Sequence, residues 1–372
     1  MKKHCLIIGA GHAGIQAATL LREEGFDGEI TLFSDETVLP YQKPPLSKGF
    51  LVGKQTTENL LFRNAAYFEE QNIRLELGQI IVHIDTNEQT IQNQLGKTWA
   101  FSHLILATGA RNRTLPLPEF SDKVFTLRTL QDAQSIRQKL ETATQISVIG
   151  GGFIGLETAA AAIEMGKKVT VFETGERLMQ RVLPPVLSSI FLEKHLEKGV
   201  DVRLQTQATY EDLKGSDLIV VGIGVLPNQE LAEEAGLTCS NGIEVNVFQQ
   251  TSHPSIYAIG DCALHFNPFA GRNIRLESVQ NANDQAKTAV LHIVGRPQIY
   301  QAVPWFWTNQ FDLKLQMAGI NTEYDRYEIK GEAPKFSVYY YKNDQLIAVD
   351  SLNKPADHLA ARKALAEQFV NR

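Results

Sequence analysis

The sequence predicts an α/β protein of three domains, and three observations carry this prediction. One local pattern of strand, glycine-rich turn, helix and strand occurs twice, at residues 4–35 and 145–173. The 372 residues exceed what a single hydrophobic core usually covers. From residue 303 onward the composition shifts, because the last 70 residues hold 11 of the 31 aromatic side chains. We therefore expect two similar α/β domains and a third, β-rich domain.

The first copy of the pattern begins with the apolar strand Cys5–Ile8. This strand leads into the turn Gly9-Ala10-Gly11-His12-Ala13-Gly14, and the apolar spacing of residues 15–21 predicts a helix after it. The run Ile30–Phe33 predicts a second strand, which ends at Asp35. Together these elements form one complete βαβ unit.

The second copy begins with the strand Ile146–Ile149 and the turn Gly150-Gly151-Gly152-Phe153-Ile154-Gly155. An alanine-rich helix follows over residues 156–165, and the strand Val169–Phe172 ends at Glu173. In both copies the acidic residue comes about 20 residues after the last glycine, which is the spacing of dinucleotide-binding folds of the Rossmann type.

Each glycine of such a turn has a mechanical purpose. The first allows the tight turn, the second lets the backbone approach a pyrophosphate, and the third lets the helix pack closely on the sheet. The helix N-terminus then offers free N–H groups to the phosphates. One such motif alone is often only a packing turn, but two copies in full context favour two bound dinucleotides. FAD in one site and a nicotinamide nucleotide in the other would allow hydride transfer between them.

The acidic residues predict which nicotinamide nucleotide binds. Asp35 and Glu173 are each expected to accept hydrogen bonds from a ribose hydroxyl, and a carboxylate there repels a 2′-phosphate. The first arginine after Glu173 is Arg177. We therefore expect NADH rather than NADPH at the second site.

Other segments predict the remaining elements. A proline-rich loop covers residues 40–48, and strand-like runs occur at 80–84, 103–106, 218–221 and 256–259. In the C-terminal stretch, Phe336–Tyr341 predicts a strand and Ala356–Val370 a helix.

Composition excludes several classes of function. Acidic residues outnumber basic ones by 42 to 36, without long runs of like charge, which argues against nucleic acid as a partner. The longest apolar run, residues 218–226, is too short to cross a membrane, and no signal peptide is visible, so we expect a cytoplasmic protein without a membrane span. The cysteines Cys5, Cys239 and Cys262 form no paired motif, so neither a disulfide framework nor a metal site is expected.

With these motifs the chain resembles the FAD-dependent, NADH-using ferredoxin reductases of the putidaredoxin reductase type. That family, part of the disulfide-reductase-like flavoproteins, serves cytochrome P450 and ring-hydroxylating dioxygenase systems. The resemblance covers nearly the whole chain. It rests on these segments, in order: Pro44-Pro45-Leu46-Ser47-Lys48, Ala107-Thr108-Gly109, Leu127-Arg128-Thr129-Leu130, Gly150 to Glu157, Gly222-Ile223-Gly224, Gly260-Asp261-Cys262-Ala263, Glu277 to Ala282, and Pro304-Trp305-Phe306-Trp307.

The resemblance implies a division into domains and a set of cofactor-binding residues. Residues 1–114 and 248–302 would form the FAD domain, 115–247 the NADH domain, and 303–372 a C-terminal interface domain. The implied FAD-binding residues are Gly9, Gly11, Ala13, Gly14, Asp35, Lys48, Ile81, Ala107, Thr108, Gly109, Arg128, Asp261, Val279 and Trp305. The implied NADH-binding residues are Gly150, Gly152, Ile154, Gly155, Glu157, Glu173, Gly222 and Gly224.

Two of these residues are expected to act in the reaction. By resemblance, Lys48 favours electron-rich flavin and Glu157 orients the incoming nicotinamide amide. The alternative for Lys48 is a solvated loop charge. Asp261 is placed between a strand and a helix, where it would hold a ribityl hydroxyl, cap the helix, or do both.

The chain also departs from the family pattern. Residues 199–216 lack the hairpin that relatives usually carry, and the early C-terminus puts the partner-docking surface in doubt. Thr308-Asn309 stands where many relatives have Ser-Asp, and Lys43 stands where arginine is common. The basic residues that we consider for docking an acidic ferredoxin are Arg63, Lys287 and Lys314.

The expected activity is hydride transfer from NADH to FAD, followed by electron transfer to a [2Fe–2S] ferredoxin. Rubredoxin is the second choice of acceptor, and an NADH oxidase using oxygen is a further alternative. A different class remains open, an interaction protein resembling apoptosis-inducing factor. Because the loop after Asp35 contains no cysteine, disulfide and peroxide reduction are disfavoured.

Overall fold

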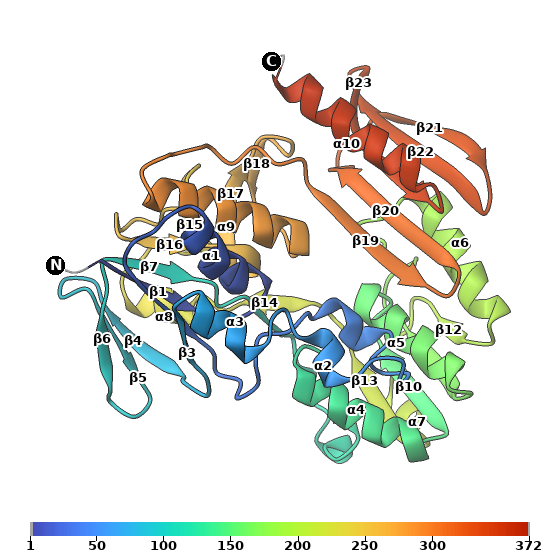
Figure 1. Cartoon of the computed structure of the whole chain (residues 1–372). Helices are drawn as coiled ribbons and strands as arrows, with labels where there is room; N and C mark the ends of the chain where they lie inside the picture. Colours follow the sequence, from blue (N-terminus) through green and yellow to red (C-terminus); the bar gives the residue numbers. More distant parts are fainter. Residues whose placement is uncertain (1–2, 371–372) are drawn as a thin grey trace.

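The computed structural model describes residues 3–370, so residues 1–2 and 371–372 of the predicted terminal domains lie outside it. Figure 1 shows three lobes. Segments from both ends of the first 302 residues share one lobe, the middle of the chain forms a second, and the C-terminal stretch forms a third.

The first lobe is built on a parallel sheet in the order β16-β7-β1-β2-β3. Its strands are β1 (His4–Ile8), β2 (Glu29–Phe33), β3 (Ile73–Glu76), β7 (His103–Leu106) and β16 (Ile256–Ala258). Helices α1 (His12–Glu23) and α9 (Val279–Ile293) pack side by side against this sheet (Figure 1). Ile7, Ile15 and Ala286 belong to the buried core between them. The predicted first βαβ unit is confirmed.

The second lobe repeats this design with the order β12-β11-β10-β13-β9, again all parallel. The strands are β9 (Val124–Phe125), β10 (Gln145–Ile149), β11 (Lys168–Phe172), β12 (Asp201–Arg203) and β13 (Leu218–Val221). Its main helices are α4 (Leu130–Thr142), α5 (Phe153–Glu164) and α6 (Pro185–Glu197). In both sheets the strand before the glycine turn lies at the centre, as dinucleotide-binding folds require.

Smaller elements complete these two lobes. One antiparallel sheet joins β4 (Ile81–Asp85), β5 (Thr90–Asn93) and β6 (Thr98–Ala100), and another sheet joins β15 (Ile243–Val245), β17 (Ala263–Asn267) and β18 (Arg272–Ile274). The short helices are η1 (Pro44–Ser47), α2 (Thr57–Leu60), α3 (Ala65–Glu70), η2 (Pro118–Phe120), α7 (Tyr210–Leu213), α8 (Glu230–Glu234) and η3 (Gly260–Cys262).

The chain enters and leaves the second lobe through two paired segments. Strands β8 (Ala110–Asn112) and β14 (Val225–Pro227) lie antiparallel. Next to them, the Thr108 hydroxyl donates to the Asn228 carbonyl at 2.6 Å, and the Asn228 side-chain amide donates to the Thr108 carbonyl at 2.8 Å. This pairing ties the two connections together, while the exact domain boundaries stay a prediction.

The C-terminal lobe is an antiparallel sheet in the order β19-β20-β23-β22-β21 with one helix packed on it. Its elements are β19 (Trp305–Gln310), β20 (Leu313–Gly319), β21 (Arg326–Glu332), β22 (Lys335–Lys342), β23 (Gln345–Leu352) and α10 (Pro355–Val370). The predicted strand 336–341 and helix 356–370 are thereby confirmed. Within residues 3–370, the longest helices are too short or too polar to span a bilayer.

Candidate functional site

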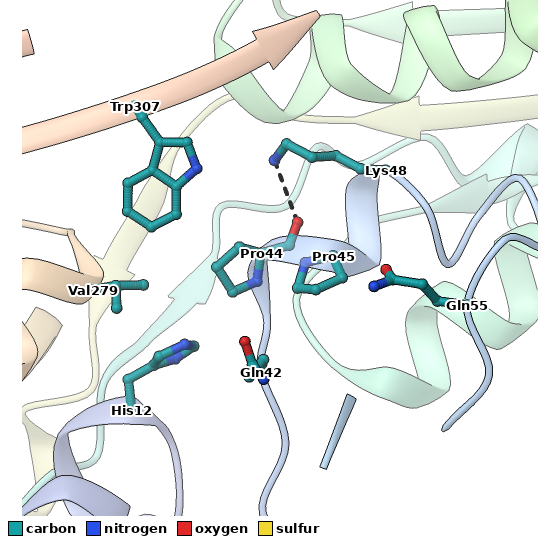
Figure 2. Close-up of a pocket in the computed structure, with 8 residues that line it drawn as sticks. All are labelled: His12, Gln42, Pro44, Pro45, Lys48, Gln55, Val279 and Trp307. Carbon is teal, nitrogen blue, oxygen red and sulfur yellow. Dashed lines mark hydrogen bonds between the residues drawn. The ribbon is translucent and has the colours of Figure 1, made fainter. Parts of the chain in front are cut away.

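A cavity of about 320 Å³ is lined by residues of the first lobe and by one residue of the C-terminal lobe. Figure 2 shows residues from the α1 N-terminus, the proline-rich loop, the α9 N-terminus and β19 facing it from different sides. The lining residues are His12, Gln42, Pro44, Pro45, Lys48, Gln55, Val279 and Trp307. The predicted residues Lys48 and Val279 therefore share one cavity.

The first glycine motif leaves an open cradle beside this cavity. Gly9 has a φ of +107°, and a Cβ there would lie 2.2 Å from the Ala107 carbonyl oxygen. A Cβ on Gly14 would lie 1.8 Å from the Gly9 carbonyl oxygen, whereas a Cβ on Gly11 would meet no atom within 4 Å. Gly9 and Gly14 thus serve close packing, and the space at Gly11 is free for a ligand.

Helix α1 begins without a cap. Its N-cap residue Gly11 makes no side-chain hydrogen bond, and its first turn contains no acidic residue. By contrast, α4 and α9 are capped by Thr129 and Ser278. The free N–H groups at this helix start fit the pyrophosphate of a dinucleotide, and the open space at Gly11 fits its close approach.

The second glycine motif has the same design. A Cβ on Gly150, whose φ is +110°, would lie 2.5 Å from the Gly222 carbonyl oxygen, and one on Gly155 would lie 2.1 Å from the Gly150 carbonyl oxygen. The N-cap Gly152 of α5 is again uncapped, and its nearest contact would be 3.9 Å away. The chain therefore has two equivalent glycine turns, each at the uncapped start of a helix, which we call the first and second cradle.

Lys48 and Glu157 form an ion pair between the two motifs. Lys48 Nζ lies 2.6 Å from Glu157 Oε2, and it also donates to the Pro44 carbonyl at 3.3 Å (Figure 2). Lys48 follows η1, whose two prolines fix the start of that turn. Glu157, on the second turn of α5, is only 5% exposed. The alternative of a freely solvated Lys48 is not what the structure shows.

The Glu157 carboxylate has two further donors that sequence reasoning missed. The Ser47 hydroxyl donates to Oε2, and the Thr308 hydroxyl donates to Oε1 at 2.7 Å. Ser47 lies within the recognised Pro44–Lys48 segment, so its position was a usable signal. Thr308 appeared only as a departure from the family pattern, and nothing in the sequence indicated its contact with Glu157.

Glu173 binds the backbone of the second cradle in this structure. Its Oε2 accepts from the Gly151 N–H at 2.7 Å and its Oε1 from the Gly175 N–H at 2.6 Å. Arg177, the first arginine after it, donates to the Leu183 carbonyl and the Ser188 hydroxyl. The Arg177 guanidinium is therefore engaged within the protein, and the preference for NADH over NADPH stays a prediction.

Arg128 and Asp261 form a second ion pair across the site, with 2.7 Å between Nη2 and Oδ2. The expectation that a helix follows Asp261 was wrong, so the alternative role of Asp261 as the cap of that helix falls with it. Asp261 lies in the short turn η3, whose N-cap position is Ile259, and strand β17 follows it. Ala263 and Leu264 follow Asp261 directly and are buried in strand β17, so this segment does not form a surface helix.

His12 was missed as a site residue although it lies inside the first glycine motif. Its ring packs edge-on against Phe62 and lines the cavity. Burial first of all lowers the pKa of His12 to about 4, Asp261 opposes this effect, and the cations Lys43 and Arg128 add to it. His12 is therefore neutral here at physiological pH, and the fixed positive charge comes from the nearby cations.

The other predicted residues take various positions. Ala13 is buried at the start of α1, Ile81 begins β4, and Asp35 is exposed after β2. Ile154 is 42% exposed at the second cradle. Trp305 packs against Arg362 and His358 of α10, and its neighbour Trp307 lines the cavity. A contact between Trp305 and a cofactor stays a prediction.

The three cysteines are all free thiols. Cys5 and Cys262 are fully buried, and burial raises the pKa of both thiols. Burial also raises the pKa of Cys239 to about 11. A thiolate poised for redox chemistry needs the opposite shift.

Comparison with known proteins adds independent findings. Residues 3–286 match the pyridine nucleotide-disulphide oxidoreductase family, and residues 305–370 match the reductase C-terminal family. Rhodocoxin reductase of Rhodococcus erythropolis is 43% identical, over 98% of this chain and 90% of its own length. A rubredoxin-NAD(+) reductase of Pseudomonas putida is 38% identical, over 94% of this chain and 96% of its own length. The crystal structure of a covalent putidaredoxin reductase–putidaredoxin complex matches with a TM-score of 0.93 and 37% identity, covering 98% of this chain and 93% of that chain.

Proposed function

The chain belongs to the pyridine nucleotide-disulphide oxidoreductase family, whose members use a flavin and NAD(H), and from this premise we propose that it is an FAD-dependent NADH:ferredoxin reductase. The resemblance stated from the sequence motifs is confirmed by the family match and the relatives. The proposed acceptor is a [2Fe–2S] ferredoxin that feeds a P450 or a ring-hydroxylating oxygenase.

The observation that carries the proposal is the Lys48–Glu157 ion pair between two phosphate cradles. FAD would lie along the first cradle, with Gly11 and the α1 N-terminus at its pyrophosphate and Asp35 at a ribose. NADH would lie along the second cradle, with Gly152 at its pyrophosphate and Glu173 at a ribose. When bound, FAD accepts a hydride and passes on single electrons, a chemistry that side chains cannot supply.

The roles of the chain's own residues follow from these positions. Lys48 would place a positive charge at the flavin. Glu157 would keep the Lys48 side chain in position through the ion pair and accept a hydrogen bond from the nicotinamide amide. Arg128 and Lys43 act on His12 of the cavity as nearby cations, and each is paired with a carboxylate, Arg128 with Asp261 and Lys43 with Glu36. These groups bind and orient, so the proposal needs no nucleophile and no general acid.

Other acceptors are less well supported. The match to a rubredoxin-NAD(+) reductase keeps rubredoxin as the second candidate. Oxygen as the sole acceptor, or a switch like that of apoptosis-inducing factor, has no comparable support here. Free thiols suit a reducing compartment, so we propose that the protein works in the cytoplasm.

A reconstitution experiment tests the proposal. The purified protein, loaded with FAD, is given NADH and cytochrome c with a [2Fe–2S] ferredoxin, with rubredoxin, or with no carrier. We expect rapid cytochrome c reduction only when ferredoxin is added. Equal rates without a carrier would point to oxygen or direct reduction, and a faster rate with rubredoxin would reassign the partner. Slow turnover with every carrier, together with a long-lived NADH complex, would favour the switch.

A further inference from the structure

We propose that Thr308, Gln310 and His195 are positioning residues that hold Glu157 through a buried chain of hydrogen bonds. The proposal rests on the proposed function, because it assumes that Glu157 orients NADH. It extends that function to residues of the C-terminal lobe and of α6, neither of which carries a glycine motif.

The chain of hydrogen bonds consists of three consecutive contacts. The Thr308 hydroxyl lies 2.7 Å from Glu157 Oε1, Gln310 Nε2 lies 3.2 Å from Thr308 Oγ1, and His195 Nε2 lies 2.9 Å from Gln310 Oε1. All three positioning side chains are at most 1% exposed. Water therefore does not compete for these hydrogen bonds, and a partner lost from the chain would leave a buried polar group unsatisfied.

The alternation of strand β19 explains why its residues reach this place. Successive side chains on a strand point to opposite faces, so Phe306, Thr308 and Gln310 share one face. Phe306 packs on Phe153, at a ring-centroid distance of 4.8 Å, and Thr308 contacts Glu157 one helical turn further along α5. The register of β19 along α5 thus places the Thr308 hydroxyl at the carboxylate.

The hydrogen bonds have one direction, because a carboxylate oxygen and an amide oxygen can only accept. Thr308 must donate to Glu157, Gln310 donates through its amide nitrogen to Thr308, and His195 donates through Nε2–H to the amide oxygen of Gln310. The second amide N–H of Gln310 faces Met179 Sδ at 3.9 Å. The three hydrogen bonds that link His195 to Glu157 are therefore all donated in the direction of Glu157.

This direction fixes the state of the histidine. With the proton on Nε2, Nδ1 keeps a lone pair, and this buried atom has no hydrogen-bond partner among residues 3–370. Burial lowers the pKa of His195, which favours the neutral ring. The reversed amide of Gln310 would instead require a buried, unpartnered Nδ1–H donor, a costlier arrangement than an unused lone pair.

Both carboxylate oxygens of Glu157 accept hydrogen bonds from side chains. Thr308 occupies Oε1, while Lys48 and Ser47 occupy Oε2, so the carboxylate cannot rotate without breaking contacts on both sides. Since the donors come from the first and third lobes and Glu157 from the second, the carboxylate is anchored to all three. A carboxylate that meets the nicotinamide amide in one fixed orientation lowers the entropic cost of alignment.

The first test uses two substitutions at one position. Thr308→Val keeps the side-chain shape and removes the hydroxyl, and Thr308→Ser keeps the hydroxyl and removes the methyl group. In stopped-flow measurements of the FAD-loaded proteins, we expect Thr308→Val to lower the limiting rate of flavin reduction by NADH about tenfold. The apparent NADH dissociation constant and FAD content should change little, and Thr308→Ser should restore most of the rate.

Several results would overturn the inference. Unchanged reduction in Thr308→Val, or equal loss in Thr308→Ser, would show that the hydroxyl does not position Glu157. Failure of the wild-type protein to be reduced by NADH would instead refute the proposed function, so the two failures are distinguishable.

A second measurement is independent of activity, because it reads the ring of His195 in the wild-type protein and uses a variant only to assign the signal. ¹⁵N NMR of the histidine-labelled wild-type protein reports the tautomer of each ring, and His195→Gln identifies the signal of His195. We expect a neutral Nε2–H ring for His195. A neutral Nδ1–H ring, or a charged ring at neutral pH, would contradict the direction of the chain.

Discussion

Lys48 Nζ lies 2.6 Å from Glu157 Oε2, although the two residues are 109 positions apart and belong to different βαβ lobes. Lys48 is one-quarter exposed and Glu157 is almost completely buried. Bringing a buried carboxylate to a lysine is costly unless further donors satisfy it, and Ser47 and Thr308 supply them. The pair is therefore a stabilised contact between the two lobes that carry the glycine motifs.

Replacing Lys48 should slow the reaction without removing the cofactor. In Lys48→Ala the flavin loses a nearby positive charge and Glu157 loses one donor, so we expect flavin reduction by NADH to slow at least tenfold while FAD stays bound. Stopped-flow absorbance measures the rate, and the spectrum measures the FAD content. The matched control is Lys168→Ala, at an exposed position at the start of β11, which should reduce normally. An unchanged rate in Lys48→Ala would leave Lys48 as loop surface.

Two glycines of one motif should respond differently to alanine. Gly11→Ala meets no atom and needs no unusual backbone angle, so we expect the protein to fold with its unfolding temperature little changed but to bind FAD at least tenfold more weakly. Gly9→Ala would force a Cβ against the Ala107 carbonyl at a φ of +107°, so this variant should be strongly destabilised. FAD titration of the apoprotein and thermal unfolding measure the two effects. Full FAD affinity in Gly11→Ala would show that FAD does not bind at the turn around Gly11.

The carboxylate of Glu173 should determine the choice of nicotinamide. In Glu173→Ala we expect the ratio of kcat/KM for NADPH to that for NADH to rise about tenfold, because the charge that repels a 2′-phosphate is gone. Glu173→Gln removes the charge but keeps an acceptor for the Gly151 or Gly175 N–H. If Glu173→Gln raises the NADPH to NADH ratio as much as Glu173→Ala does, the negative charge of Glu173 causes the preference for NADH. If neither variant shifts it, Glu173 only shapes the loop.

Asp350 should make the stability of the protein depend on pH. This carboxyl is fully buried on β23, where burial raises its pKa to about 7, although Tyr340 and Asn321 donate hydrogen bonds that oppose the shift. Between about pH 4 and pH 7 the unfolded chain has lost this proton and the folded chain retains it. The contribution of Asp350 to the free energy of unfolding therefore falls as pH rises through that window.

Asp350→Asn should remove this slope. Denaturant unfolding followed by circular dichroism at several pH values between 4 and 8 measures it. The matched control is Asp344→Asn in the exposed turn before β23, which should keep the wild-type pH dependence. The same slope in Asp350→Asn and the wild type would show that Asp350 does not titrate in this range.

Local patterns predicted the two cradles because everything that they need lies within about 30 consecutive residues. The strand, the glycines and the helix spacing are all visible there, and the structure confirms each of them at residues 4–33 and 145–172. The contact between Thr308 and Glu157 could not be predicted in this way. It depends on how β19 docks on α5, and hydrophobic periodicity does not encode the register between a strand and a distant helix.

Asp261 and the tryptophans show the same limit. Asp261 follows a strand as expected, but tertiary pairing makes the next segment a strand and not a helix. Trp305 and Trp307 share one face of β19, yet the first reaches α10 and the second the cavity. The two tryptophans are only two residues apart, and the packing of α10 on the sheet determines which of them contacts α10 and which lines the cavity.

The most direct test of two cooperating cradles is an anaerobic titration of the FAD-loaded protein with NADH, repeated with NADH that carries deuterium in the transferable position at C4. We expect one equivalent of NADH to remove the oxidised flavin absorbance, and we expect deuterium to slow this step because the hydride passes directly between the two rings. An oxidised spectrum that persists in excess NADH, or a reduction that proceeds without any isotope effect on the hydride step, would contradict this prediction.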